Sequence, residues 1–119
     1  MDDECTLYKT VDFVGKRWTL LILLELYKSS SNSRRYSDIK ANLPDITPKV
    51  LSARLKELEK EGLVKKKIDA SKFPVRCDYT LTKSGEDFIK IIKDVKQWAL
   101  KWKIKNKICE KASCKNCSL

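Results

Sequence analysis

The stretch that decides the fold lies at residues 43–58 and reads LPDITPKVLSARLKEL. Thr47 is a residue type favoured at a helix N-cap, and Pro48 follows at the first helical position, where its missing N–H group costs no hydrogen bond. A helix is therefore predicted from here to Gly62. One side of its wheel carries Leu51, Leu55 and Leu58, and the other carries Lys49, Ala53, Lys56 and Lys60, with Ser52 at its margin. We expect the leucine side to pack and the short, polar, basic side to face outward.

Two helices are predicted ahead of this stretch. Trp18, Leu21 and Ile22 recur at helical spacing, which indicates a helix from about residue 17 to residue 27. Residues 29–33 then form a polar turn cluster. A short helix follows with Tyr36 and Ile39, and Pro44 ends it.

Beyond Gly62, two strands and a long helix are predicted. Residues 63–68 and 77–81 have strand patterns, and residues 69–76 between them form a hairpin tip. From Thr82, a capping residue, the helix carries an apolar stripe that we expect to be a partner interface. The stripe consists of Phe88, Ile91, Ile92, Val95, Trp98, Ala99 and Trp102. Like Trp18, the two stripe tryptophans are expected in the core or in an interface.

The predicted order of elements is the layout of a winged helix-turn-helix, a mainly α fold with a small β-hairpin. In that layout the third helix fits the major groove of DNA, and hairpin cations meet phosphates beside it. The side chains predicted to face the groove are Thr47, Lys49, Ser52, Ala53 and Lys56. The predicted phosphate or minor-groove contacts are Arg34, Arg35, Lys72 and Arg76. For each of them, a solvated surface charge is the alternative.

Composition supports a nucleic-acid partner and excludes many enzymes. The 119 residues fit one domain, and 26 basic against 16 acidic residues give a net charge of +10. A lysine surface that only aids solubility is the alternative. The chain has no histidine, which removes Ser-His-Asp and Cys-His catalysis and the HExxH zinc site, so no catalysis is expected. The acidic start and the short apolar run at residues 20–24 predict a cytoplasmic protein without a membrane span.

Four separated blocks, in order, resemble the HxlR-type regulators, which are relatives of the MarR group. They read VGKRWTLLIL (residues 14–23), RYSDI (35–39), LPDITPKVLSARLKEL (43–58) and RCDYTLT (76–82), and the likeness covers roughly residues 5–102. The resemblance implies a homodimer formed by the first and last helices that binds near-palindromic promoter DNA. It also implies a DNA-binding and dimerisation domain at residues 1–105. The cysteine-rich tail at residues 106–119 departs from the family pattern.

Cys5 stands where many members of that family carry a cysteine that senses oxidants or electrophiles. A helix start favours the thiolate, which is the reactive form of cysteine, whereas Asp2, Asp3 and Glu4 oppose ionisation. An ordinary thiol near the chain end is the alternative. Cys77, in phase with Tyr79 and Leu81, is expected in the core as a small apolar residue.

The tail spaces Cys109, Cys114 and Cys117 as C-x4-C-x2-C. Three thiolates at this spacing wrap a zinc ion or an iron-sulfur cluster when a fourth ligand joins them, and Cys5 is the candidate for that ligand. A thiol-disulfide switch and no role at all are the two alternatives.

The sequence therefore predicts a homodimeric, sequence-specific DNA-binding transcriptional regulator that represses and that responds to redox, electrophile or metal signals through its cysteines. A cysteine- or metal-responsive module that docks proteins on its winged helix is the alternative from another class. A nonspecific DNA coater is a third hypothesis, which Ser52 and Ala53 disfavour because they leave room for base contacts.

Overall fold

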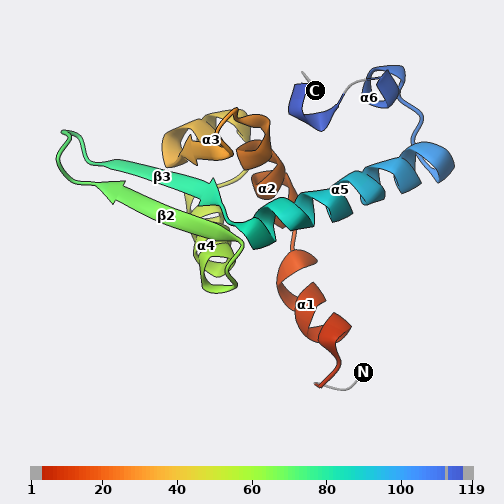
Figure 1. Cartoon of the computed structure of the whole chain (residues 1–119), viewed down its shortest axis with the longest axis horizontal. Coiled ribbons are helices and arrows are strands. Elements are labelled where there is room, and N and C mark those ends of the chain that lie inside the picture. The colour runs from red at the N-terminus through yellow and green to blue at the C-terminus, as the bar shows by residue number, and fades with distance from the viewer. Residues whose placement is uncertain (1–3, 112, 117–119) are drawn as a thin grey trace.

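A computed structural model describes residues 4–111 and 113–116 of the chain, without the side chains of Cys109 and Asn116. Helices and one sheet alternate along the chain (Figure 1). The elements are α1 (Thr6–Val14), α2 (Thr19–Lys28), β1 (Ser33–Arg35), α3 (Tyr36–Asn42), α4 (Pro48–Lys60), β2 (Val64–Asp69), β3 (Arg76–Leu81), α5 (Lys83–Trp102), α6 (Lys107–Lys111) and the 3-10 turn η1 (Cys114–Asn116).

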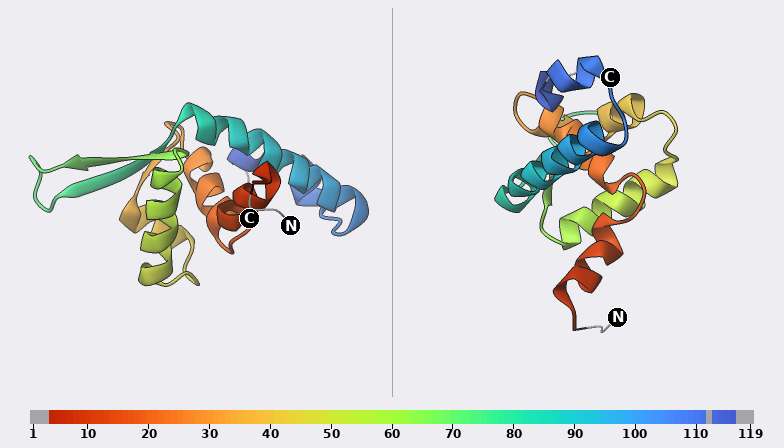
Figure 2. Two further views of the ribbon diagram at one scale, coloured as in Figure 1. Left: turned by 90° about the horizontal axis from the view of Figure 1, so that it is seen from below. Right: turned by 90° about the vertical axis from the view of Figure 1, so that its right-hand side faces the viewer.

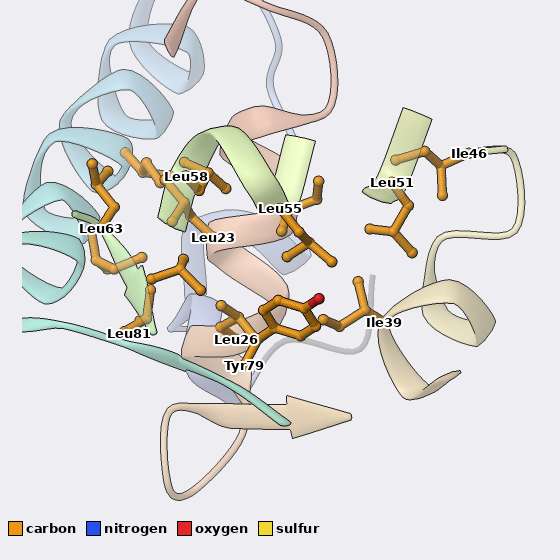
Figure 3. Packing of buried hydrophobic residues seen from close by; sticks show 14 residues of the cluster. Leu23, Leu26, Ile39, Ile46, Leu51, Leu55, Leu58, Leu63, Tyr79 and Leu81 are labelled. Carbon is orange, nitrogen blue, oxygen red and sulfur yellow. The ribbon is translucent and has the colours of Figure 1, made fainter. Parts of the chain in front are cut away.

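The core forms where α2, α3 and α4 meet the root of the sheet and the first half of α5. Leu51, Leu55 and Leu58 of α4 are buried, as their spacing predicted, and they pack toward Leu26 of α2 and Tyr79 of β3 (Figure 3). Because the leucine side of α4 is buried in this core, the opposite side of the helix lies at the surface. No helix in the described part of the chain is long and apolar enough to cross a membrane.

The hairpin is part of a three-stranded antiparallel sheet in the order β1-β3-β2. The prediction of a two-stranded hairpin was therefore incomplete. In β1, Ser33 pairs with Thr80 and Arg35 with Asp78, while Val64 of β2 pairs with Leu81. β1 has three polar residues and no apolar alternation, so backbone pairing to β3 is what makes it a strand, and local sequence cannot reveal that.

A separate first helix, α1, precedes the helix predicted from residue 17. Trp18 adopts a left-handed backbone conformation, with φ of 82°, and α2 begins only at Thr19. The Thr19 hydroxyl donates to the Phe13 carbonyl oxygen at 3.2 Å, which links the two helices. None of the residues of α1 is buried in the single chain.

Helix α5 begins as predicted, because the Thr82 hydroxyl oxygen accepts from the Gly85 N–H at 3.2 Å. Its predicted stripe divides into two parts. Ile92 is buried with Ile89, and Phe88 packs against the core, whereas Trp98 and Trp102 are 55% and 65% exposed. The second half of α5 extends away from the sheet (Figure 2). A core position is therefore wrong for these two tryptophans, while Trp18 does pack against the core.

Candidate DNA interface

The N-cap and the outward side of α4 present every side chain predicted to face the major groove. Thr47, Lys49, Ser52, Ala53 and Lys56 are all exposed. The Thr47 hydroxyl oxygen accepts from the Val50 N–H at 3.2 Å and so caps the helix, as predicted. Because α4 is held from its other side by buried leucines, these side chains are displayed on a rigid support.

Tyr36 ties the start of α3 to the first turns of α4. Its hydroxyl donates to the Pro48 carbonyl oxygen at 3.3 Å and lies 3.3 Å from the Ser52 hydroxyl oxygen. This fixes the angle between the two helices of the helix-turn-helix at the end of α4 that carries Ser52. From the sequence, Tyr36 was predicted only as an apolar position of the short helix. Its contacts with Pro48 and Ser52, which lie 12 and 16 positions further along the chain, depend on the tertiary fold.

Three of the four predicted phosphate contacts lie together beside the β2–β3 hairpin, which is the wing of this fold. Arg35, Lys72 and Arg76 line one shallow cavity of about 520 Å³, between the start of α3 and the hairpin. Arg76 is also paired with Asp78, at 2.9 Å between Nε and Oδ2. These three cationic side chains therefore surround the same cavity as Tyr36.

The hairpin turn is stabilised by Asp69. Its carboxylate accepts hydrogen bonds from the hydroxyl and the backbone N–H of Ser71. These bonds hold the pKa of Asp69 below its usual value, and Lys72 and Lys67 lower it further. The carboxylate is therefore held within its own turn by Ser71 and is close enough to Lys72 and Lys67 to interact with their charges.

Arg34 points the other way. Its Nε donates to the Glu25 carbonyl oxygen at 2.7 Å and lies 3.9 Å from the Glu25 carboxylate. Successive residues of a strand face opposite sides, so Arg34 and Arg35 are directed apart. The structure does not bring Arg34 together with the other cationic side chains of the interface.

A second cavity separates the last turns of α4 from α1. It measures about 1030 Å³ and is lined by Ala53 and Lys56 on one wall and by Lys9 and Phe13 on the other. An ion pair joins Glu57 of α4 to Lys16, which lies between α1 and α2. α1 therefore lies beside the outward side of α4 without covering it.

The cysteines occupy separate places. Cys5 is half-buried at the N-cap of α1. Cys77 is half-buried and packs against the core as expected. Burial first, and then the neighbouring Cys77, raise the pKa of Tyr79 well above its usual value.

The tail cysteines are described only in part. Cys114 is half-buried in η1, which lies against α2, while Cys117 and the side chain of Cys109 are outside the described residues. Helix α1, which Cys5 precedes, and the turn η1, which contains Cys114, lie on opposite sides of α5 (Figure 1). Across residues 4–111 and 113–116, the described side chains form no group of three or more metal ligands.

Lys115 anchors this tail. Its Nζ donates to the carbonyl oxygens of Tyr27 and Ser29, at 2.7 and 3.1 Å, and to the Asn32 side chain at 3.2 Å. It also lies 4.4 Å from the centre of the Tyr27 ring. A lysine that neutralises the C-terminal carbonyls of α2 is stabilising there because of the helix dipole.

Comparisons with known proteins agree with this arrangement. The HxlR-like helix-turn-helix family matches residues 13–107. The HTH-type transcriptional regulator YvaP of Bacillus subtilis is 43% identical over 94 residues, which cover 79% of this chain and 83% of YvaP.

Two solved structures have the same fold over most of their length. One, described as a MarR-family transcriptional regulator from Porphyromonas gingivalis W83, has a TM-score of 0.74 and 32% identity, covering 86% of this chain and 96% of that one. The reduced form of the regulator YodB from B. subtilis has a TM-score of 0.73 and 29% identity, covering 87% of this chain and 98% of YodB. YodB has also been solved after diamide treatment and with bound quinone.

The family match spans the helix-turn-helix, the wing and α5, the elements that build the interface described above. This chain therefore belongs to the HxlR-like helix-turn-helix family and is an HTH-type transcriptional regulator, not an enzyme.

Proposed function

We propose that the chain is a homodimeric repressor that binds a near-palindromic operator, with one α4 in the major groove of each half-site. The observation that carries this proposal is the outward side of α4, where exposed polar and basic side chains stand on a buried leucine side. Lys49, Ser52, Ala53 and Lys56 meet base edges, Thr47 meets the backbone, and Arg35, Lys72 and Arg76 meet phosphates. Arg34, held by Glu25, positions β1 instead.

Homodimer formation is supported by apolar side chains that the single chain leaves in water. On α1 these are Leu7 and Val11, and on α5 they are Val95, Trp98 and Trp102. Burial of such residues is favourable by about 25 cal/mol per Å² of apolar surface. A second copy covers both helices at once because a two-fold axis brings the same patch from each partner.

The test is selection of duplexes from a random library, followed by titration of the selected duplex at increasing salt. We expect one enriched palindromic sequence and an affinity that falls steeply with salt, since several phosphates are contacted. Lys49→Ala is expected to weaken binding roughly tenfold, and Lys103→Ala, at the exposed residue that follows α5, is the matched control. Equal binding of all duplexes favours the nonspecific coater, and no DNA binding favours the protein-docking module.

A response to thiol chemistry is the second part of the proposal. Cys5 at the start of α1 borders the helix proposed to form the dimer, so a group added to its sulfur changes how two copies meet. The similarity to YodB, which has been solved in reduced, diamide-treated and quinone-bound forms, supports this. We expect diamide or a quinone to lower operator affinity of the native chain and to leave Cys5→Ser unchanged.

The cysteines of the tail are the third part of the proposal. Cys109, Cys114 and Cys117 are proposed to bind zinc or an iron-sulfur cluster, or to resolve a disulfide with Cys5 of the other copy. Zinc, iron and sulfide content per chain, measured on protein purified without oxygen, separates these roles. A stoichiometric metal that is lost in Cys114→Ser assigns a metal site, and metal-free protein with reactive thiols assigns the switch.

A further inference from the structure

Phe73 at the wing tip is wholly in water. Its side chain is 100% exposed, and the neighbouring Val75 is 58% exposed. A single exposed apolar side chain is common, but this hairpin exposes three large ones, since Ile68 is also 60% exposed. Several exposed apolar side chains on one projecting hairpin indicate a contact with a partner. The loop between β2 and β3, which contains Phe73, lies at the opposite end of the molecule from the C-terminal half of α5 (Figure 1).

The surroundings of Phe73 are cationic. The cavity beside it is lined by Arg35, Lys72 and Arg76, and no acidic side chain lines it. On the paired strand, residues 65–67 are three exposed lysines. An apolar loop surrounded by cationic side chains is complementary to a surface that has anionic edges and stacked aromatic rings between those edges. The minor groove of DNA, with its phosphate rims and stacked base pairs, is such a surface.

The position of the hairpin relative to α4 also allows its tip to reach the minor groove. α4 and the hairpin diverge from one root at Gly62 and Leu63, and the hairpin projects sideways from α4 (Figure 2). Tyr36 lines the wing cavity and is bonded to α4 at Pro48 and Ser52. When α4 occupies the major groove, the hairpin tip is therefore directed at the minor groove that flanks it.

We propose that Phe73 inserts between two base pairs of this flanking minor groove and makes the wing a reader of base-step deformability. This inference rests on the proposed operator binding. Inserted phenylalanines partly unstack a base step, and pyrimidine–purine steps such as TA and CA unstack most easily. Phe73 thus confers a preference for such a step at a position that α4 does not touch.

DNA is a better occupant of this tip than a second copy of the chain. A second copy would bring its own Lys72 and Arg76 against the same cations, and like charges at close range are repelled. The tip also offers one aromatic side chain rather than a broad apolar face, which suits a slot between base pairs.

The experiment uses the full chain and the duplex that it selects, with 2-aminopurine placed in turn at each flanking position. Native protein is expected to raise the emission at one step, because an unstacked 2-aminopurine is less quenched. Phe73→Ala is expected to lose that signal and to bind roughly tenfold more weakly, the size of an aromatic stacking contact. Phe73→Trp is expected to keep both the 2-aminopurine signal and the affinity of the native protein.

Two matched comparisons complete the design. Lys72→Ala is expected to reduce the salt dependence of binding while the 2-aminopurine signal remains, since it removes a phosphate contact only. Replacing the pyrimidine–purine step with a stiffer step is expected to weaken DNA binding by the native protein and to leave DNA binding by Phe73→Ala unchanged. Because Phe73 is fully exposed and lies outside the buried core, circular dichroism of the variants should match the native protein.

The inference is overturned if Phe73→Ala binds the selected duplex as tightly as native protein with the same emission, in which case the proposed operator binding stands. It is equally overturned if Phe73→Ala changes only the oligomeric state or the binding to vesicles of anionic lipid. If native protein selects no duplex, the proposed function fails, and this inference fails with it.

Discussion

Glu25 holds three elements together from a buried position. Its side chain accepts from the Asn42 amide at 3.1 Å, and it lies 3.8 Å from Lys28 Nζ and 3.9 Å from Arg34 Nε. Glu25→Ala leaves these donors without a carboxylate, and we expect a loss of about 1–3 kcal/mol in unfolding free energy. Urea unfolding measures this. Glu59→Ala, at an exposed position of α4, is the control, and equal midpoints for the two variants would contradict the role of Glu25.

Tyr79 makes stability depend on alkaline pH. Burial raises the pKa of Tyr79 above the value of about 10 for an unfolded tyrosine, so the unfolded chain releases this proton first. Its contribution is fully present below about pH 10 and is lost as pH rises further, by at most about 1.4 kcal/mol per pH unit. Urea unfolding between pH 8 and 11 should show a steeper decline for native protein than for Tyr79→Phe. Parallel declines would show that Tyr79 does not titrate as described.

Single residues also show where sequence reasoning ends. Thr47 and Thr82 were predicted as N-caps because capping is a local interaction, and both are confirmed. Arg34 and Arg35 are neighbours in the sequence and were grouped together. Only the pairing of β1 with β3, which joins residues more than 40 positions apart, reveals that their side chains face opposite sides.

At the level of elements, Gly85 shows tertiary packing overruling helix propensity. Alanine favours a helix over glycine by about 1 kcal/mol, yet a Cβ at Gly85 would lie 2.2 Å from the Leu63 carbonyl oxygen. We expect Gly85→Ala to destabilise the fold by about 1–3 kcal/mol, because backbone must move to make room. Thermal unfolding measures it, with Ser84→Ala, exposed in the same turn, as the control. A melting temperature at or above that of native protein would contradict the close approach of α5 to Leu63.

The elements that were predicted well are those with strong local patterns. α4 has a cap, a leucine side and a terminal glycine, and its observed bounds, Pro48–Lys60, follow from these. β1 and the break between α1 and α2 lack such patterns. β1 depends on its partner strand, and the break depends on the left-handed backbone of Trp18, which no propensity favours.

At the scale of the whole molecule, the exposed apolar side chains of α1 and α5 form the interface proposed for a second copy. Val95→Glu places a charge in the proposed interface, and we expect it to weaken the dimer by roughly 100-fold or more, equivalent to about 3 kcal/mol. Sedimentation should find native protein as a dimer and the variant as a monomer with an unchanged circular dichroism spectrum. Gln97→Glu, exposed on another side of α5, is the control. A native monomer at micromolar concentration would contradict the interface.

The assembly was predictable only in outline. The apolar stripe of α5 indicated an interface, but the sequence could not divide it into the part buried in its own chain, Ile92 and Phe88, and the part left exposed, Trp98 and Trp102. That division depends on where α5 leaves the sheet, which is a property of the whole fold.

The central claim is that two copies of the chain read two half-sites of one operator. A hydroxyl-radical footprint on the selected duplex, at saturating protein, tests it most directly. Two protected half-sites centred about one helical turn, or a multiple of it, apart are predicted, because a two-fold dimer presents its α4 helices to successive major-groove faces. Protection of a single half-site at saturation, or of none, would contradict it.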